Sequence, residues 1–168
     1  MKFVPIHSNI CGFTLLEMLV ALVIMAVTVA SASLALRPDD GRQLASEAER
    51  LALLLAQARE ESELGGMRLA WVAAEDHYEF ERREMTGNGP SWSVLRGDDL
   101  LHPRRLPVGF TIRRIEADGR QLAYGERLNL DPLGVRWVKI ELSMGEARTL
   151  IRSVEEGFEV TPLARSDS

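Results

Sequence analysis

A run of nineteen consecutive residues without a charged side chain, Met18–Leu36, constrains this chain more than any other feature. At roughly 1.5 Å per residue, a helix of that length covers nearly the whole hydrocarbon thickness of a bilayer. The single charge within residues 12–36 is Glu17, which comes directly before the run. We therefore expect a transmembrane helix over residues 13–36.

The segment before the apolar run differs from an ordinary signal peptide. A signal peptide has basic residues, then a shorter apolar region, and then a small-residue cleavage site. Here the small residue, Gly12, lies before the apolar run, and the only charged side chain preceding it is Lys2. Cleavage at Gly12 would leave the hydrophobic helix on the mature protein.

The string GFTLLE at residues 12–17, followed directly by a long apolar helix, resembles the type IV prepilin class. The resemblance implies that prepilin peptidase removes residues 1–12 as a leader, cutting between Gly12 and Phe13. It also implies N-methylation of the new N-terminus, Phe13, and a role for Glu17 in assembly.

A physical reason for the role of Glu17 can be given from the residues themselves. A carboxylate at the membrane face of an apolar helix is costly to bury without a partner. The free amine of a neighbouring subunit supplies one, and the buried pair then sets the axial register between stacked helices. The alternative is a Glu17 side chain that only reaches the lipid headgroups.

The expected location follows mainly from the resemblance. Segments that flank a membrane helix usually carry more Lys and Arg on the cytoplasmic side. This rule favours a cytoplasmic N-terminus only weakly here, because Lys2 precedes the apolar run but Arg37 follows it. The prepilin class implies a bacterial inner-membrane protein with a single pass, an N-terminus that is cytoplasmic before processing, and a periplasmic C-terminal head.

Composition bounds the remainder of the chain. Of the 168 residues, about 130 follow the apolar segment, which is enough for one domain with a modest core. The net charge of −5 and the pI of about 5.3 argue against a nucleic-acid-binding surface. The only cysteine, Cys11, lies in the leader, so the mature protein would have no disulfide, which is compatible with the periplasm.

The apolar pattern changes at residue 37. Pro38 interrupts the helix, by a kink rather than a break in our interpretation. Residues 37–64 then form a periplasmic amphipathic segment with its helix at about 42–64, closed by Gly65 and Gly66. Its apolar positions recur at intervals of three and four residues and are Leu44, Ala48, Leu51, Leu55 and Ala58.

Residues 65–163 alternate short apolar segments with turn residues, which predicts a β-rich globular head, and residues 164–168 form a frayed tail. The fold class is therefore α+β, with a long N-terminal helix, transmembrane and then amphipathic, packed on an antiparallel β-sheet head, and the resemblance to the prepilin class implies that this fold is pilin-like. The strands are expected at 67–73, 77–83, 92–96, 110–116, 121–124, 135–142, 149–154 and 158–160.

The head resembles the GspH/FimT family of minor pseudopilins and pilins. The matching strings are SEAERLA at 46–52, LAQAREE at 55–61, GGMRL at 65–69, LDPLG at 130–134 and EGFEV at 156–160. The resemblance implies an H-type minor pseudopilin of a type II secretion system, at or near the tip of the periplasmic pseudopilus that drives export across the outer membrane. The implied partners are prepilin peptidase, other minor and major pseudopilins and the inner-membrane assembly platform, with no cofactor and no nucleic acid.

Two alternatives stay open. The first is a FimT-like minor pilin that primes type IV pili or binds DNA, although the sequence of the tail offsets the charge of Arg165 with that of Asp167 and no basic stripe is interleaved with aromatic residues. The second is a periplasmic enzyme held by one helix. Its candidate base or metal ligands are His77 and His102, which lack a second histidine at ligand spacing.

Other polar and aromatic residues have simpler interpretations. Asp98 and Asp99 could contribute to a calcium site, but no loop of alternating oxygen ligands surrounds them, so we expect a polar turn and no metal site. The tryptophans Trp71, Trp92 and Trp137 all lie in expected strands, where core or sheet-face packing is favoured over a binding platform.

Overall fold

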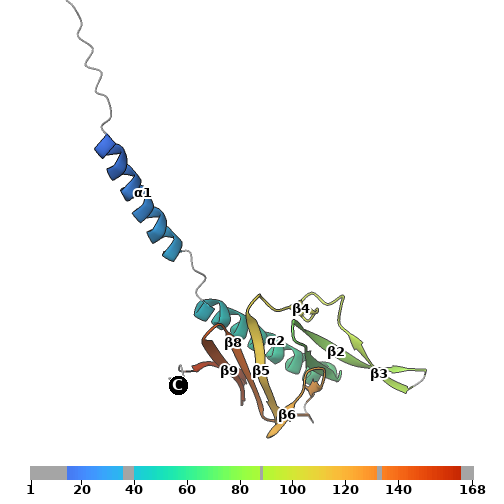
Figure 1. Cartoon of the computed structure of the whole chain (residues 1–168). Helices are drawn as coiled ribbons and strands as arrows, with labels where there is room; N and C mark the ends of the chain where they lie inside the picture. Colours follow the sequence, from blue (N-terminus) through green and yellow to red (C-terminus); the bar gives the residue numbers. More distant parts are fainter. Residues whose placement is uncertain (1–14, 36–39, 88, 132–133, 164–168) are drawn as a thin grey trace, which may run out of the picture. The chain divides into compact units, whose positions relative to one another are not determined.

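The structure is a computed structural model that describes residues 15–35, 40–87, 89–131 and 134–163. It divides into two compact units, residues 1–38 and residues 39–168, which are taken separately below. The first unit contains one described helix, and the second contains the remaining helix and every described strand (Figure 1).

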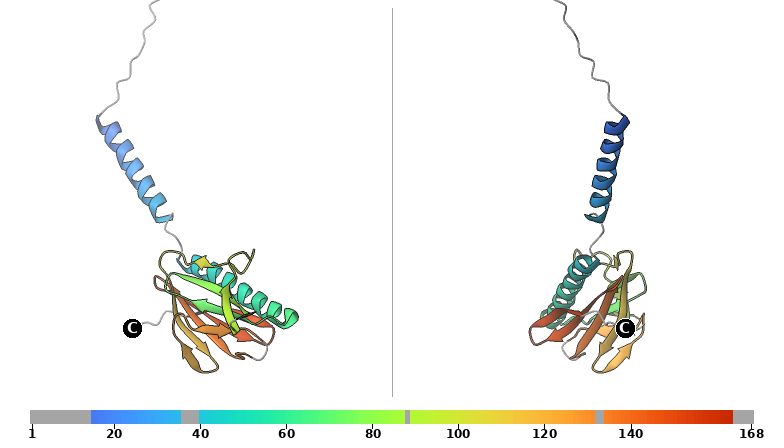
Figure 2. Two further views of the ribbon diagram at one scale, coloured as in Figure 1. Left: turned by 90° about the vertical axis from the view of Figure 1, so that its right-hand side faces the viewer. Right: turned by 60° about the vertical axis from the view of Figure 1, so that its left-hand side comes forward.

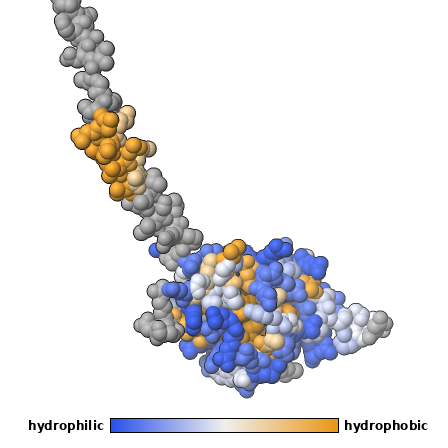
Figure 3. Space-filling model, in the orientation of Figure 1, coloured by the Kyte–Doolittle hydropathy of each residue, from blue (hydrophilic) through white to orange (hydrophobic). Residues whose placement is uncertain are grey.

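Helix α1 spans Leu15–Ala35 and is apolar on every side. Side chains are described as far as Thr28, and all of the large hydrophobic ones are between 48% and 84% exposed. Figure 3 shows this part of α1 as a continuous hydrophobic surface. Among the described residues, no helix reaches the length and hydropathy that crossing a membrane requires.

Helix α2 spans Asp40–Gly65, close to the helix expected at 42–64. Gly66 follows it with a φ of +63°, the left-handed conformation in which glycine ends helices without steric cost. The prediction that Pro38 kinks one long helix falls outside the described residues. One face of α2 is buried, and its buried residues are Leu44, Ala48, Leu51, Ala52, Leu55, Ala58 and Ser62.

The head contains two antiparallel five-stranded sheets rather than one. The first, sheet A, has the order β3-β2-β1-β7, with β4 also paired to β2. Its strands are β1 (Leu69–Ala73), β2 (His77–Thr86), β3 (Gly89–Val94), β4 (Arg104–Arg105) and β7 (Arg127–Asn129). Strands β4 and β7 were not expected from the sequence, because segments of two and three residues carry no alternation of their own.

The second sheet, sheet B, has the order β10-β9-β8-β5-β6. Its strands are β5 (Phe110–Ala117), β6 (Arg120–Leu122), β8 (Val138–Met144), β9 (Ala147–Val154) and β10 (Gly157–Leu163). The turn between β5 and β6 is made by Asp118 and Gly119, both with positive φ. These strands lie close to the segments predicted for the same part of the chain.

One irregularity in sheet B changes which side chains face the core. The register between β5 and β8 shifts between Ile112 and Arg114, where a β-bulge leaves Arg113 without an opposite partner. Strict alternation would put Ile115 on the face opposite Ile112, but the bulge turns Ile115 inward, and both are buried.

Helix α2 lies across β8, β9 and β10 and also contacts β1, as the two views in Figure 2 illustrate. Its buried stripe and the inner faces of both sheets form one hydrophobic core, with Leu55, Trp71, Phe80 and Ile140 at 0% exposure. The expectation that the apolar stripe of the amphipathic helix packs on a sheet of the same chain is confirmed, and the fold is α+β and pilin-like.

Candidate functional site

The processing motif lies at the edge of the described chain. Gly12 and Phe13, between which cleavage is expected, are outside the described residues. Glu17 is in the first turn of α1, where a carboxylate interacts favourably with the positive end of the helix dipole, and it is exposed. The structure therefore presents Glu17 on the surface of its own helix, where a neighbouring molecule can reach it.

The histidines belong to no group of three or more potential metal ligands within the described part of the head. His77 begins β2, and its Nδ1 lies 2.7 Å from Oδ1 of Asp76. This hydrogen bond lowers the pKa of the exposed Asp76 carboxyl. His102 lies in the loop before β4. No cluster of three or more His, Cys, Asp or Glu side chains occurs among residues 15–35, 40–87, 89–131 and 134–163.

The carboxylates at 98 and 99 belong to a turn. Oδ1 of Asp98 accepts hydrogen bonds from the backbone N–H groups of Leu100, at 2.9 Å, and Leu101, at 2.8 Å. Leu101 is fully buried, so Asp98 anchors a loop to the core. This is the polar turn that we expected from the sequence.

The three tryptophans have different environments. Trp71 in β1 is fully buried, and Trp92 in β3 is half-buried on the outer face of sheet A. The prediction that all three lie in strands is wrong for Trp137, which directly precedes β8 and is 67% exposed. Its backbone is held by Asp118, whose Oδ1 accepts from Trp137 N at 2.8 Å, so a turn elsewhere in the sequence determines its position.

Sheet A carries a polar cluster that the sequence did not reveal. Glu81 is only 8% exposed and pairs with Arg127, whose Nη2 lies 3.4 Å from Oε1. The guanidinium of Arg127 also lies 5.3 Å from the centre of the Trp92 ring. These residues come from β2, β7 and β3, and only the strand register brings them together.

Farther along β2, Arg83 lies opposite Arg68, which directly precedes β1. Arg83 N–H donates to the carbonyl of Arg68 at 2.8 Å, and Arg83 is also opposite Trp92 in the β2–β3 register. The sequence signal for this cluster is a series of polar residues at alternate positions, which are His77, Glu79, Glu81 and Arg83. Their partners on neighbouring strands could not be known without the register.

Three comparisons with known proteins bear on the class of this chain. Residues 7–33 match the prokaryotic N-terminal methylation motif. The chain is 35% identical over 98 residues to type II secretion system protein H of Aeromonas hydrophila, an alignment that covers 57% of this chain. It covers 52% of that relative, so the chain spans about half the length of the relative that it matches.

One solved structure supports the fold. The minor pseudopilin EpsH from the type 2 secretion system of Vibrio cholerae superimposes with a TM-score of 0.51 at 16% identity, over 77% of this chain and 100% of that one. A second structure of EpsH from the same organism gives a TM-score of 0.47 at 16% identity, over 76% of this chain and 98% of that one.

The motif and the fold together are those of prepilin-like proteins with a pilin-type α+β head, the class that this chain resembles. Within that class the chain is a homologue of type II secretion system protein H, as the resemblance of the head to the GspH/FimT family predicted.

Proposed function

We propose that this chain is a minor pseudopilin of a type II secretion system, incorporated at or near the tip of the periplasmic pseudopilus. The observation that carries the proposal is the combination, in one chain, of the methylation motif at 7–33, 35% identity over 98 residues to protein H, and a fold that matches EpsH. Its role is structural, as a subunit rather than an enzyme, and no relative reported above carries the name of an enzyme.

The processing steps follow from the motif and are part of the proposal. Prepilin peptidase cuts between Gly12 and Phe13, methylates Phe13, and leaves the apolar helix in the inner membrane with the head in the periplasm. The charge-free run Met18–Leu36 supports the membrane span. The exposure of Glu17 supports a contact with the N-terminal amine of a neighbouring subunit.

N-terminal analysis of membrane-extracted protein tests processing. The expected mature protein begins with N-methylated Phe13, and Gly12→Leu should block the cut while the helix still inserts. A mature protein that begins at Met1, or one cut after Ala30, would contradict the proposal, because the scissile bond must precede the apolar run.

Co-purification with the other pseudopilins tests the role of Glu17. Glu17→Ala should allow processing and insertion but reduce recovery with the other subunits, whereas Glu49→Ala on the exposed side of α2 should not. Unchanged recovery of the Glu17→Ala protein would mean that this carboxylate reaches only the headgroups.

The alternative of a FimT-like, DNA-binding pilin predicts a basic surface. Here Arg114 pairs with Glu116 at 2.8 Å and Arg152 with Glu159 at 2.7 Å, so carboxylates alternate with the arginines of sheet B. We expect no salt-dependent binding of double-stranded DNA at about 0.15 M salt. DNA binding that is lost when Arg113, Arg114 and Arg152 are replaced would favour the alternative.

A further inference from the structure

Two arginines lie opposite each other where β1 meets the far half of β2. The hydrogen bond from Arg83 N–H to Arg68 O makes these residues direct neighbours across the two strands, and opposite residues of an antiparallel pair project to the same face. Both side chains are exposed. Like charges directly opposite each other destabilise a sheet, so the placement is unfavourable unless an anion lies between them.

Sheet B also contains two positive side chains directly opposite each other, but there carboxylates of the same chain flank them. Lys139 and Arg152 are also direct opposites, but Glu116 flanks the pair on β5 and Glu159 flanks it on β10. Arg152 Nε donates to Oε2 of Glu159 at 2.9 Å. The row across sheet B is therefore acidic, basic, basic, acidic, and its charges balance.

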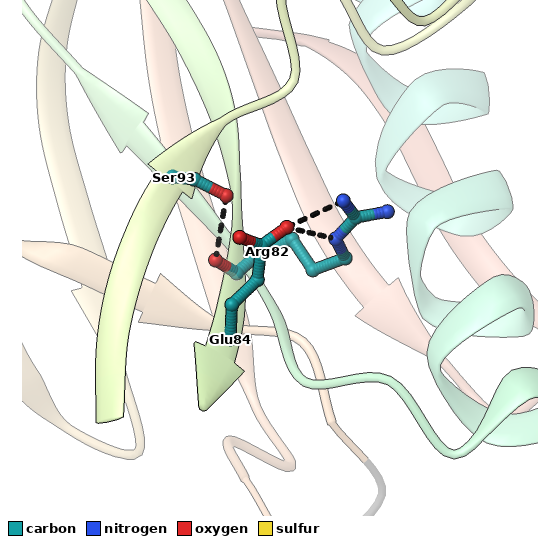
Figure 4. Close-up of polar contacts among 3 residues, drawn as sticks. All are labelled: Arg82, Glu84 and Ser93. Carbon is teal, nitrogen blue, oxygen red and sulfur yellow. Dashed lines mark hydrogen bonds and ion pairs between the residues drawn. The ribbon is translucent and has the colours of Figure 1, made fainter. Parts of the chain in front are cut away.

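No such balance surrounds Arg68 and Arg83. Within the described residues, neither guanidinium forms an ion pair. On the β3 side the row ends on Trp92 instead of a carboxylate, and on the β7 side the register continues to Asp131, which forms no ion pair with Arg68 in the described ranges. The adjacent Glu84 is already bound, because Arg82 Nε donates to its Oε1 at 3.0 Å (Figure 4). This hydrogen bond also lowers the pKa of the Glu84 carboxyl, so that it stays ionised and attached to Arg82.

The arginine pair lies beside an open strand edge. Pairing of β1 with β2 ends at Leu69 and Arg82, apart from the Arg83–Arg68 hydrogen bond, whereas β2 continues to Thr86 paired with β3 alone. Backbone groups of alternate residues point to opposite sides of a strand, so Met85 presents its N–H and C=O on the same side as Arg83. In the part of the chain that is described, these groups of Met85 have no hydrogen-bond partner.

The open edge and the arginines share one groove. Its volume is about 440 Å³, and it is lined by Gly66, Met67, Arg68, Arg83, Glu84 and Met85. Met85 is 82% exposed and Met67 is 39% exposed, so the groove offers flexible apolar side chains beside the cationic pair. When a peptide adds a strand to an open sheet edge, its backbone hydrogen bonds give affinity and its side-chain contacts give specificity. This groove offers a backbone edge for the first, and positive charge and apolar side chains for the second.

We propose that this groove docks an extended, acidic segment from the head of a neighbouring pseudopilus subunit. The segment adds a short strand at Met85 and places a carboxylate between Arg68 and Arg83, where the planar guanidinium groups can bind it in bidentate fashion. The identity of the partner as a pseudopilus subunit rests on the proposed function, whereas the preference for an acidic strand rests on the groove alone.

A peptide titration tests the chemistry without the filament. The full chain in detergent micelles, labelled with ¹⁵N-methionine, is titrated with the acetylated peptide amide TVEVET and with its counterpart TVKVKT. The acidic peptide should shift the Met85 amide signal and bind at least about tenfold more tightly than the basic one. The double variant Arg68→Gln/Arg83→Gln should lose that preference, while Arg113→Gln, on the exposed bulge of sheet B, should keep it. Equal binding of the two peptides, absence of binding, or binding undiminished in the double variant would overturn the proposal.

Cross-linking in cells then tests the partner. A photo-reactive residue at position 85 should cross-link to an acidic segment of another pseudopilus subunit, and Arg68→Gln/Arg83→Gln should abolish the adduct. The control position is Val108, which is 97% exposed and belongs to the loop before β5. Equal yields at both positions, or an adduct that survives the double variant, would overturn the docking proposal. A protein that is not recovered with any other subunit would contradict the proposed function, and the peptide result separates the two failures.

Discussion

Helices α1 and α2 have similar lengths but opposite relations to their surroundings. Every large hydrophobic side chain described in α1 is at least 48% exposed, whereas α2 has a buried stripe in which Leu44, Leu51 and Leu55 are no more than 1% exposed. Helix α2 is amphipathic and finds its apolar partner in sheets of the same chain. Helix α1 is apolar all round, which in our proposal makes lipid and neighbouring subunits its surroundings. The distribution of apolar residues around a helix thus indicates whether the helix can bury them against its own chain.

The largest expected effect tests whether the stripe of α2 is the main attachment of the helix to the sheets. Leu55→Ala should lower the free energy of unfolding of the head by about 2–5 kcal/mol, because it leaves a cavity in a fully buried site. The matched control is Leu53→Ala on the same helix at 71% exposure, with an expected change within about 0.5 kcal/mol. Urea denaturation followed by circular dichroism measures both, and equal losses would contradict the division into a buried and an exposed face.

A smaller effect tests how the beginning of α2 is held. Gly145, in the turn between β8 and β9, has a φ of +56°, and a Cβ there would lie 2.5 Å from Oδ2 of Asp40. Gly145→Ala should therefore cost about 1–3 kcal/mol through backbone strain and this contact.

The control for that prediction is Gly119→Ala, where φ is +80° and no heavy atom lies within 4 Å of an added Cβ. It should cost only the backbone strain, about 1 kcal/mol. Adding Asp40→Ala to Gly145→Ala should recover the difference between the two variants in thermal denaturation. A Gly145→Ala protein as stable as the Gly119→Ala protein would show that the Asp40 side chain at the beginning of α2 moves aside without cost.

A third prediction concerns a polar atom buried beneath α2. The Tyr78 hydroxyl is buried and has no hydrogen-bond partner among the described residues, and burial raises the pKa of Tyr78 to about 12. Because the folded pKa lies above the ordinary value of 10, Tyr78 favours the folded state below pH 10, and this contribution is lost as the pH rises through 12.

Tyr78→Phe should raise the stability at neutral pH by up to about 1 kcal/mol, since it removes an unsatisfied polar group from the core. It should also weaken the loss of stability above pH 10, as measured by denaturation at a series of pH values. A loss of stability at neutral pH would mean that the hydroxyl makes a favourable hydrogen bond after all.

The smallest expected effect concerns α1. Leu22→Ala, or a truncated protein that begins at Asp40, should change the unfolding free energy of the head by no more than about 0.5 kcal/mol, because α1 belongs to a separate compact unit. Cooperative unfolding of the truncated protein without lipid supports the comparison of the two helices. Aggregation of that protein would indicate that part of the α2 stripe normally contacts other subunits.

The extent of successful prediction differs between local and long-range features. The helix at 42–64 and most strand positions followed from periodicity and turn residues, which act over a few neighbours. Strands β4 and β7 were missed because each is too short to show a period and exists only through its pairing with β2 or β1. The exposed position of Trp137 was also missed, because a hydrogen bond from its backbone to Asp118, far away in sequence, sets it.

By itself, the sequence determined the match to the methylation motif at 7–33, the position of Glu17, the apolar α1 and the stripe of α2, and it predicted cleavage between Gly12 and Phe13. Each of these depends on the order and spacing of nearby residues. The tertiary structure alone decided that a bulge at Arg113 turns Ile115 inward and that Arg68 meets Arg83 at the open edge of β2. Both depend on strand register, and a shift of one residue in register moves every side chain of a strand to the opposite face.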